Sequence, residues 1–68
     1  MERDHMDVQS RIRTIEADLK ARRITVAEFL ADIGVGRTSW QMWKNGSNLP
    51  SMSKWAKVEA GAARLNGQ

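Results

Sequence analysis

The chain has 68 residues, a formal net charge of +3 and no cysteine. This length allows one domain at most, and a domain this small buries only about 60% of its unfolded surface. Without cysteine, neither disulfides nor thiolate metal sites can stabilise this small core. The three tryptophans are therefore expected to supply much of the buried apolar area.

The charge is unevenly distributed along the chain. Residues 1–34 contain six Lys or Arg and seven Asp or Glu, whereas residues 35–68 contain five Lys or Arg and one Asp or Glu. No carboxylate side chain lies between Asp32 and Glu59. Positive charge gathered on one part of a small domain is typical of proteins that bind polyanions, although a solvated basic face has the same composition.

The first predicted helix follows a flexible leader, residues 1–6, whose lone His5 is expected to be a surface residue because the chain has no second His and no Cys. A buried stripe is indicated by apolar residues spaced by four, three and four positions: Val8, Ile12, Ile15 and Leu19. Charged residues of the same helix are expected to face water: Arg11, Arg13, Glu16, Asp18 and Lys20. Asp7 is the expected cap. Near the end, Arg22 and Arg23 suit the negative pole of the helix, or contact phosphate.

A second, shorter helix is predicted over residues 25–33. Thr25 and Glu28 have the spacing of a capping box, in which each side chain binds the backbone amide of the other. The buried side of this helix is expected to contain Phe29, Leu30 and Ile33. Gly34 then supplies the left-handed residue that ends it.

A third helix is predicted over residues 36–45 and is closed by Gly46. At about 100° per residue, Trp43 and Gly36 lie on the same side as Trp40, which predicts an inner face. The opposite side is expected to carry Thr38, Gln41, Met42 and Asn45, flanked by Arg37 and Lys44.

The last predicted helix covers roughly residues 51–65, with Ser51 as its cap. Its apolar contacts are expected to come from Met52, Trp55, Ala56, Val58, Ala62 and Leu65. Gly61 lowers the helix propensity and indicates a close approach to another helix. The sequence has no strand pattern, so the expected fold is all-α, a small bundle of four or five helices in one domain over residues 7–66.

The succession of a capped helix, a glycine turn and an amphipathic second helix is that of a helix-turn-helix. Residues 24–65 resemble the phage repressor and Cro family, the Xre-type helix-turn-helix proteins, in an ordered set of matches: Ala27, Phe29, Ile33, Gly34, Val35, Trp40, Trp43, Asn45-Gly46 and Pro50. The sequence departs from the family at Val26, often a phosphate-binding Gln, and at Leu30, often Ala. The first departure removes an anchoring contact, and the second indicates a wider or shifted crossing of the two helices.

This resemblance implies a lambda repressor-like fold that binds double-stranded DNA as a homodimer, without a cofactor, metal, small-molecule ligand or membrane. Base contacts would come from Arg37, Thr38, Ser39, Gln41 and Met42. Phosphate contacts would come from Thr25, Lys44, Asn45, Ser47 and Asn48, with Lys54 as a further candidate. Arg suits guanine, Gln suits adenine, and methyl groups suit thymine.

Several readings stay open at this stage. Ser39 can serve as a cap or packing residue, Met42 can belong to a dimer surface, and Lys54, Lys57 and Arg64 can form a solvated face. No pattern of paired acid and base, and no phosphate-binding glycine motif, indicates an enzyme.

We therefore expect a cytoplasmic, nucleoid-associated transcriptional regulator of bacterial or phage origin, most simply a repressor. A protein-interaction module of antitoxin or inhibitor type on the same fold is the first alternative. An architectural or excision-type DNA-binding protein is the second.

Overall fold

The computed structural model describes residues 7–67. Over those residues it has no strand and contains four helices: α1 (Val8–Ala21), α2 (Val26–Ile33), α3 (Arg37–Asn45) and α4 (Met52–Asn66). The expected small all-α bundle is therefore confirmed. The predicted leader and His5 lie outside the described residues. No helix within residues 7–67 has the length and apolar character needed to cross a membrane.

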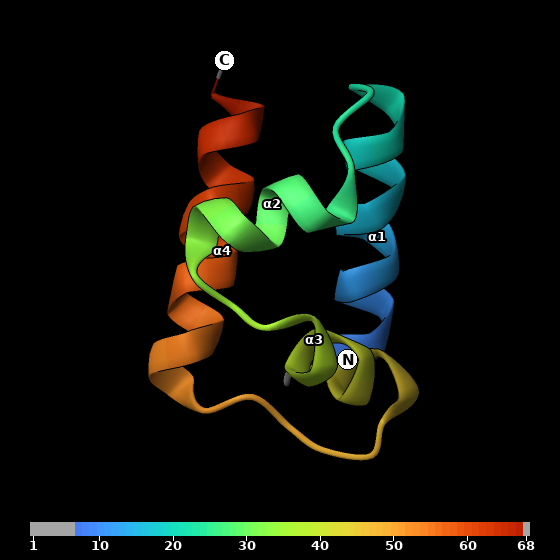
Figure 1. Ribbon diagram of the computed structural model, residues 1–68, viewed down its shortest axis with the longest axis vertical. Coiled ribbons are helices and arrows are strands. Elements are labelled where there is room, and N and C mark those ends of the chain that lie inside the picture. Colours follow the sequence, from blue (N-terminus) through green and yellow to red (C-terminus); the bar gives the residue numbers. More distant parts are fainter. Residues whose placement is uncertain (1–6, 68) are drawn as a thin grey trace, which may run out of the picture.

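The four helices place α3 at one end of the molecule. α1 and α4 extend in the same direction along the long axis, and α2 crosses between them (Figure 1). α3 lies beyond α2, at the end where α1 and α4 begin (Figure 1). It packs mainly on α1, whereas α2 packs on both α1 and α4. One side of α3 therefore packs against the bundle, and the opposite side faces away from the other helices.

Helix starts follow the predicted side-chain caps at Asp7, Thr25 and Ser51. The Thr25 hydroxyl accepts from the Glu28 amide at 3.1 Å, and the Glu28 carboxylate accepts from the Thr25 amide at 2.9 Å. This reciprocal pair satisfies two donors that the first turn of α2 would otherwise leave exposed. The short helix is thereby fixed at the point where the chain leaves α1.

Helix ends use left-handed residues, two of them predicted. Gly34 closes α2 with φ of 75° and Gly46 closes α3 with φ of 82°, where a side chain would be strained. The predicted end of α1 near Arg22 is confirmed, because the helix ends at Ala21 with Arg22 as its C-cap. The left-handed Arg23 that follows, with φ of 61°, was not predicted. Its amide donates to the Lys20 carbonyl at 3.0 Å, and the Ile24 amide donates to the Leu19 carbonyl at 2.9 Å. The strained residue thus completes the stop of α1.

The core lies where the inner sides of all four helices meet. Aromatic rings form a chain across it: Phe29 meets Trp40 at 6.1 Å, Trp40 meets Trp43 at 6.3 Å, and Trp43 meets Trp55 at 6.4 Å, each edge to face. Such pairs contribute about 0.5–1.5 kcal/mol beyond their burial. The buried apolar residues are Ile12, Ile15, Leu19, Phe29, Leu30, Ile33, Val35, Trp40, Trp43, Val58 and Ala62.

Two predicted apolar contacts of α4 are wrong. Met52 is 91% exposed, and Ala56 is also exposed. They lie about 120° and 160° around the helix from buried Val58, so they face away from the bundle. Gly61 does mark a close approach, as predicted. A Cβ placed there would lie 2.5 Å from the Ile33 Cγ2 atom.

An ion pair joins α1 to α4 at a point where Arg11 was expected to face water. Its Nη2 lies 2.8 Å from Glu59 Oε1 and its Nε lies 3.0 Å from Glu59 Oε2, with both side chains about one third exposed. Hydrogen bonds from Arg11 lower the pKa of the Glu59 carboxyl below its ordinary value. Trp55 Nε1 is buried without a hydrogen-bond partner within the described part of the chain.

Candidate nucleic-acid interface

The two faces of α3 differ sharply in exposure. Trp40 is 2% exposed and Trp43 is 3% exposed, so both indoles pack inward as predicted. Arg37, Thr38 and Gln41 are exposed on the same helix. Because α3 has only nine residues, two buried indoles one turn apart determine which side of it can face a partner.

The remaining predicted base-contact residues are less exposed. Ser39 and Met42 are half-buried. Gly36 was placed on the inner face by the angular prediction, and this is wrong. It is exposed, and a Cβ built on it would meet nothing within 4 Å. The reason is that Gly36 is the N-cap with extended backbone, so helical angles do not apply to it.

The N-terminus of α3 lacks the side-chain cap that the other three helices have. Gly36 makes no side-chain hydrogen bond, whereas Asp7, Thr25 and Ser51 each accept a backbone amide. The first amides of a helix have no intrahelical partner and carry the positive end of the dipole. At α3, therefore, no side-chain cap from residues 7–67 occupies these donors.

The predicted phosphate contacts lie on three segments. Asn45, Ser47 and Asn48 are exposed at the end of α3 and in the following turn, and Lys54 is exposed in the first turns of α4. Thr25 is exposed at the start of α2, but its hydroxyl already accepts the Glu28 amide. Any phosphate contact by Thr25 would share that oxygen.

Lys44 is not a free cation. Its Nζ lies 3.0 Å from Glu16 Oε1 on α1, and the Lys44 side chain is 37% exposed. The other carboxylate oxygen, Glu16 Oε2, accepts from Trp40 Nε1 at 2.9 Å. Nearby, Gln9 Nε2 donates to the Lys44 carbonyl at 3.3 Å. We call the two contacts of Glu16, to Trp40 and to Lys44, the Glu16 bridge.

Two of the predicted phosphate contacts share a groove with Arg23, for which phosphate contact was the second interpretation, and with Lys20, which was expected only to face water. Thr25 and Lys44 line an open groove of about 530 Å³ between α1, the start of α2 and the end of α3. Lys20 and Arg23 line it too, together with Glu16, Ile24 and Val26. For Arg23, this placement was indicated by its position two residues before the Thr25 cap.

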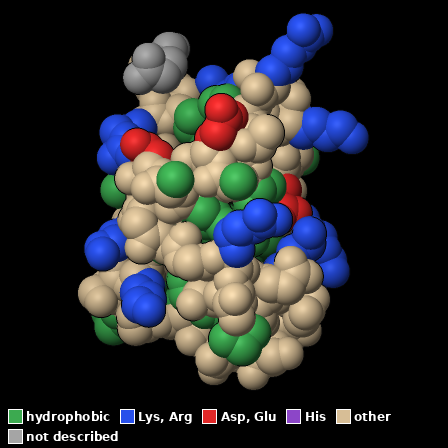
Figure 2. Space-filling view, in the orientation of Figure 1, with side chains coloured by type: hydrophobic (Ala, Val, Ile, Leu, Met, Phe, Trp, Pro, Cys, Tyr) green, Lys and Arg blue, Asp and Glu red, His purple; other side chains and the backbone are tan. Residues whose placement is uncertain are grey.

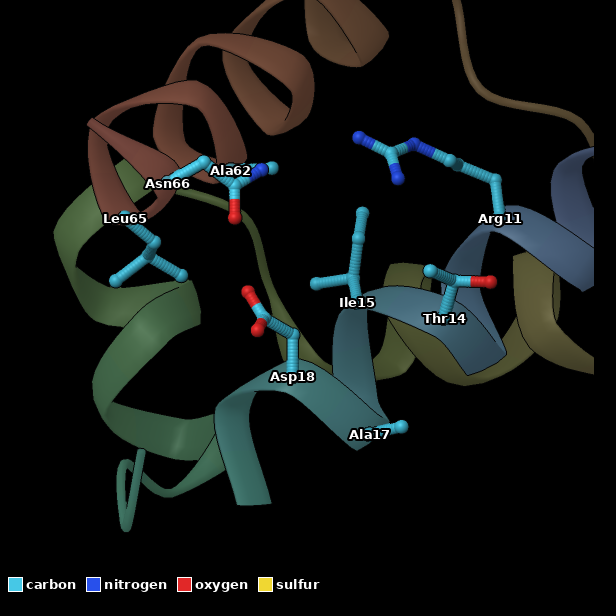
Figure 3. A pocket seen from close by; sticks show the side chains of 8 residues that line it. All are labelled: Arg11, Thr14, Ile15, Ala17, Asp18, Ala62, Leu65 and Asn66. Atoms are coloured by element: carbon cyan, nitrogen blue, oxygen red, sulfur yellow. The ribbon is translucent and has the colours of Figure 1, made fainter. Parts of the chain in front are cut away.

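A further groove lies between α1 and α4, where Arg11, Asp18, Ile15 and Leu65 point toward one another (Figure 3). Its volume is about 390 Å³. The charged groups on its rim are already paired, Arg11 with Glu59 and Asp18 with Arg22. It contains none of the predicted site residues. Within residues 7–67, no three His, Cys, Asp or Glu side chains are grouped as metal ligands would be.

Acidic side chains are unevenly placed around α3. In the view of Figure 2, the lower part of the surface, where Figure 1 places α3 and the turn that follows it, shows no Asp or Glu side chain. The sequence accounts for this, because no carboxylate lies between Asp32 and Glu59. The surface visible there favours an anionic partner, whereas Glu16 of α1 contacts the inner side of α3 at Trp40 and Lys44.

A comparison of the chain with known protein families, curated proteins and solved structures gives no match.

Proposed function

We propose that this protein binds duplex DNA as a sequence-specific transcriptional regulator, with the outer face of α3 in the major groove. The single observation that carries the proposal is the division of α3 into a buried tryptophan face and an exposed face with Arg37, Thr38 and Gln41. A helix of this width fits the major groove, and these side chains match guanine, thymine and adenine edges.

The surroundings of α3 support contact with the DNA backbone. The uncapped amides at its N-terminus suit a phosphate oxygen. Asn45, Ser47, Asn48 and Lys54 would contact phosphates on one side, and Thr25 and Lys44 on another. These contacts would fix the orientation of α3 and supply most of the affinity.

In this proposal the protein resembles the phage repressor and Cro family in action, as a repressor that uses no cofactor. Two copies would occupy a two-fold symmetric site, with half-sites about one helical turn apart. An architectural DNA-binding protein would share the same charges but would bend DNA with little base preference.

Selection of bound sites from a random duplex pool tests the proposal most broadly. The expected product is a recurring sequence with two-fold symmetry, bound with an affinity that falls steeply as salt rises. Binding without base preference would favour the architectural role. Absence of salt-dependent DNA binding would reject the proposal as a whole.

A second candidate is a protein-interaction module, which one observation favours. Leu49 and Met52 are 75% and 91% exposed, and both follow α3 in the chain. Large apolar side chains exposed to solvent can contribute to protein-binding surfaces. Replacing both with Ser would abolish binding to a protein partner while leaving the affinity for a short half-site duplex unchanged.

A further inference from the structure

The Glu16 bridge joins α1 to two residues of α3 that lie one helical turn apart. Trp40 and Lys44 are at positions i and i+4, so their side chains emerge on the same side of α3. One carboxylate oxygen accepts from the Trp40 indole at 2.9 Å, and the other lies 3.0 Å from the Lys44 ammonium. Both oxygens of Glu16 are thus used by a single neighbouring helix.

This arrangement restrains how far α3 can rotate about its own axis. Apolar packing of Trp40 and Trp43 is non-directional and tolerates small rotations. A hydrogen bond to the indole N–H is directional and weakens steeply as its angle falls. The Glu16 side chain is only 21% exposed, so water replaces its contacts poorly.

A rotation of α3 would displace the outer face directly. Arg37 and Gln41 lie on the same short helix as Trp40 and have no contact of their own with α1 among the hydrogen bonds of residues 7–67. Their positions relative to the bundle therefore depend on how the inner side of α3 is held. Base recognition by bidentate hydrogen bonds requires such a fixed geometry.

We propose that Glu16 is a positioning residue for DNA recognition: its hydrogen bond to Trp40 sets the rotation of α3 and so the alignment of Arg37 and Gln41 with base edges. This inference rests on the proposed function. It identifies a residue outside the DNA-contacting surface, Glu16, on which the sequence specificity of binding depends. Glu16 reduces overall affinity at the same time, because it places a carboxylate beside Lys44 and close to the groove that contains Thr25.

Two substitutions of equal charge separate the hydrogen bond from the charge. Glu16→Gln and Glu16→Ala both remove one negative charge, but only Gln keeps an oxygen that can accept from the Trp40 indole. Both variants should therefore bind random duplex more tightly than the wild-type protein, by a similar factor. Only Glu16→Ala should lose discrimination between specific and random duplex. The ratio of the two affinities should fall about five- to tenfold, which is part of the discrimination that one base contact provides.

Trp40→Phe provides a second test, because it keeps an aromatic ring at this position, although a smaller one, and removes the N–H donor. It should lower the same ratio as Glu16→Ala does, and combining the two substitutions should lower it no further. Circular dichroism establishes that each variant is folded at the assay temperature. Should Glu16→Ala not fold, the comparison of Glu16→Gln with Trp40→Phe gives the same answer. The proposal is overturned if Glu16→Ala and Trp40→Phe keep the wild-type ratio, or if Glu16→Gln loses as much of it as Glu16→Ala.

A measurement without DNA distinguishes failure of this inference from failure of the proposed function. Proton exchange of the Trp40 indole N–H, assigned by its disappearance in Trp40→Phe, should be slow in the wild-type protein and in Glu16→Gln. It should be faster in Glu16→Ala, with the Trp43 indole as an internal reference. Equal exchange of the Trp40 proton in all three proteins would overturn the bridge, whatever the protein binds.

Discussion

Gly61 of α4 lies so close to Ile33 of α2 that a Cβ on the glycine would come within 2.5 Å of Ile33 Cγ2. The same Cβ would lie 3.1 Å from Phe29 Cε1. Both neighbours belong to the buried side of α2, which packs on α4. The absence of a side chain at residue 61 is therefore what lets these two helices approach.

Gly61→Ala should destabilise the protein. Overpacking of a core costs about 1–3 kcal/mol, and the better helix propensity of alanine offsets about 0.5–1 kcal/mol of it. Urea unfolding followed by circular dichroism measures the difference. Ala63→Gly is the control for helix propensity, since Ala63 is exposed on the same helix. A Gly61→Ala protein at least as stable as the wild type would show that α2 and α4 are farther apart than described.

The Arg11–Glu59 pair should make stability depend on pH in the acidic range. Since folding lowers the pKa of Glu59, the unfolded chain binds more protons, and stability is lost as the pH falls below about 4.3. The pair is partly exposed, so we expect only about 0.5–1 kcal/mol from it. Denaturant unfolding at several pH values from about 3 to 6 should show a shallower loss in Glu59→Gln. An unchanged pH profile in that variant would contradict the contribution of the pair.

Arg23→Gly should raise stability and lower DNA affinity together. A non-glycine residue in the left-handed conformation, such as Arg23, destabilises the folded state by about 1–2 kcal/mol. Glycine removes this strain, but it also gives the unfolded chain more conformational freedom, which offsets part of the gain. The net gain in the free energy of unfolding should be about 0.5–1 kcal/mol. If the Arg23 guanidinium contacts a phosphate from its groove, the slope of log affinity against log salt should fall by about one. Unchanged affinity would show that Arg23 ends α1 but does not contact DNA.

The phosphate contacts should differ in their effect on salt dependence. Lys54 has no ion-pair partner within residues 7–67, so Lys54→Ala should lower the salt slope by about one. Lys44→Ala should lower it by less, because Glu16 already neutralises part of the Lys44 charge. Affinities for one duplex at four salt concentrations measure both slopes. A larger effect for Lys44 would mean that its ammonium leaves Glu16 completely on binding.

Local signals made most of the fold predictable. Thr25 with Glu28, and the glycines at 34 and 46, fix helix ends through contacts within a few residues. The burial of Trp40 and Trp43 followed from their separation by one helical turn. These features are determined by residues close together in the sequence, so they can be predicted from the sequence alone.

Contacts between helices were predicted poorly. Glu16 lies only about 40° around α1 from buried Ile12, which was a signal of its half-buried position. Its contacts with Trp40 and Lys44 depend on how α3 packs on α1. No pattern within a single helix predicts that packing. The exposure of Met52 has the same origin, since α4 buries the side that faces α2.

The central claim, that the outer face of α3 reads bases, is tested most directly by Arg37→Ala with Arg64→Ala as its control. Both substitutions remove one Arg charge, but Arg64 pairs with Asp32 near the end of α4, opposite the end where α3 lies (Figure 1). Binding of each variant to the selected site and to random duplex, at one salt concentration, gives the ratio of the two affinities. We predict that Arg37→Ala lowers binding to the selected site by about 1–3 kcal/mol more than binding to random duplex, while Arg64→Ala leaves the ratio unchanged. An equal loss on both duplexes in Arg37→Ala would contradict the claim.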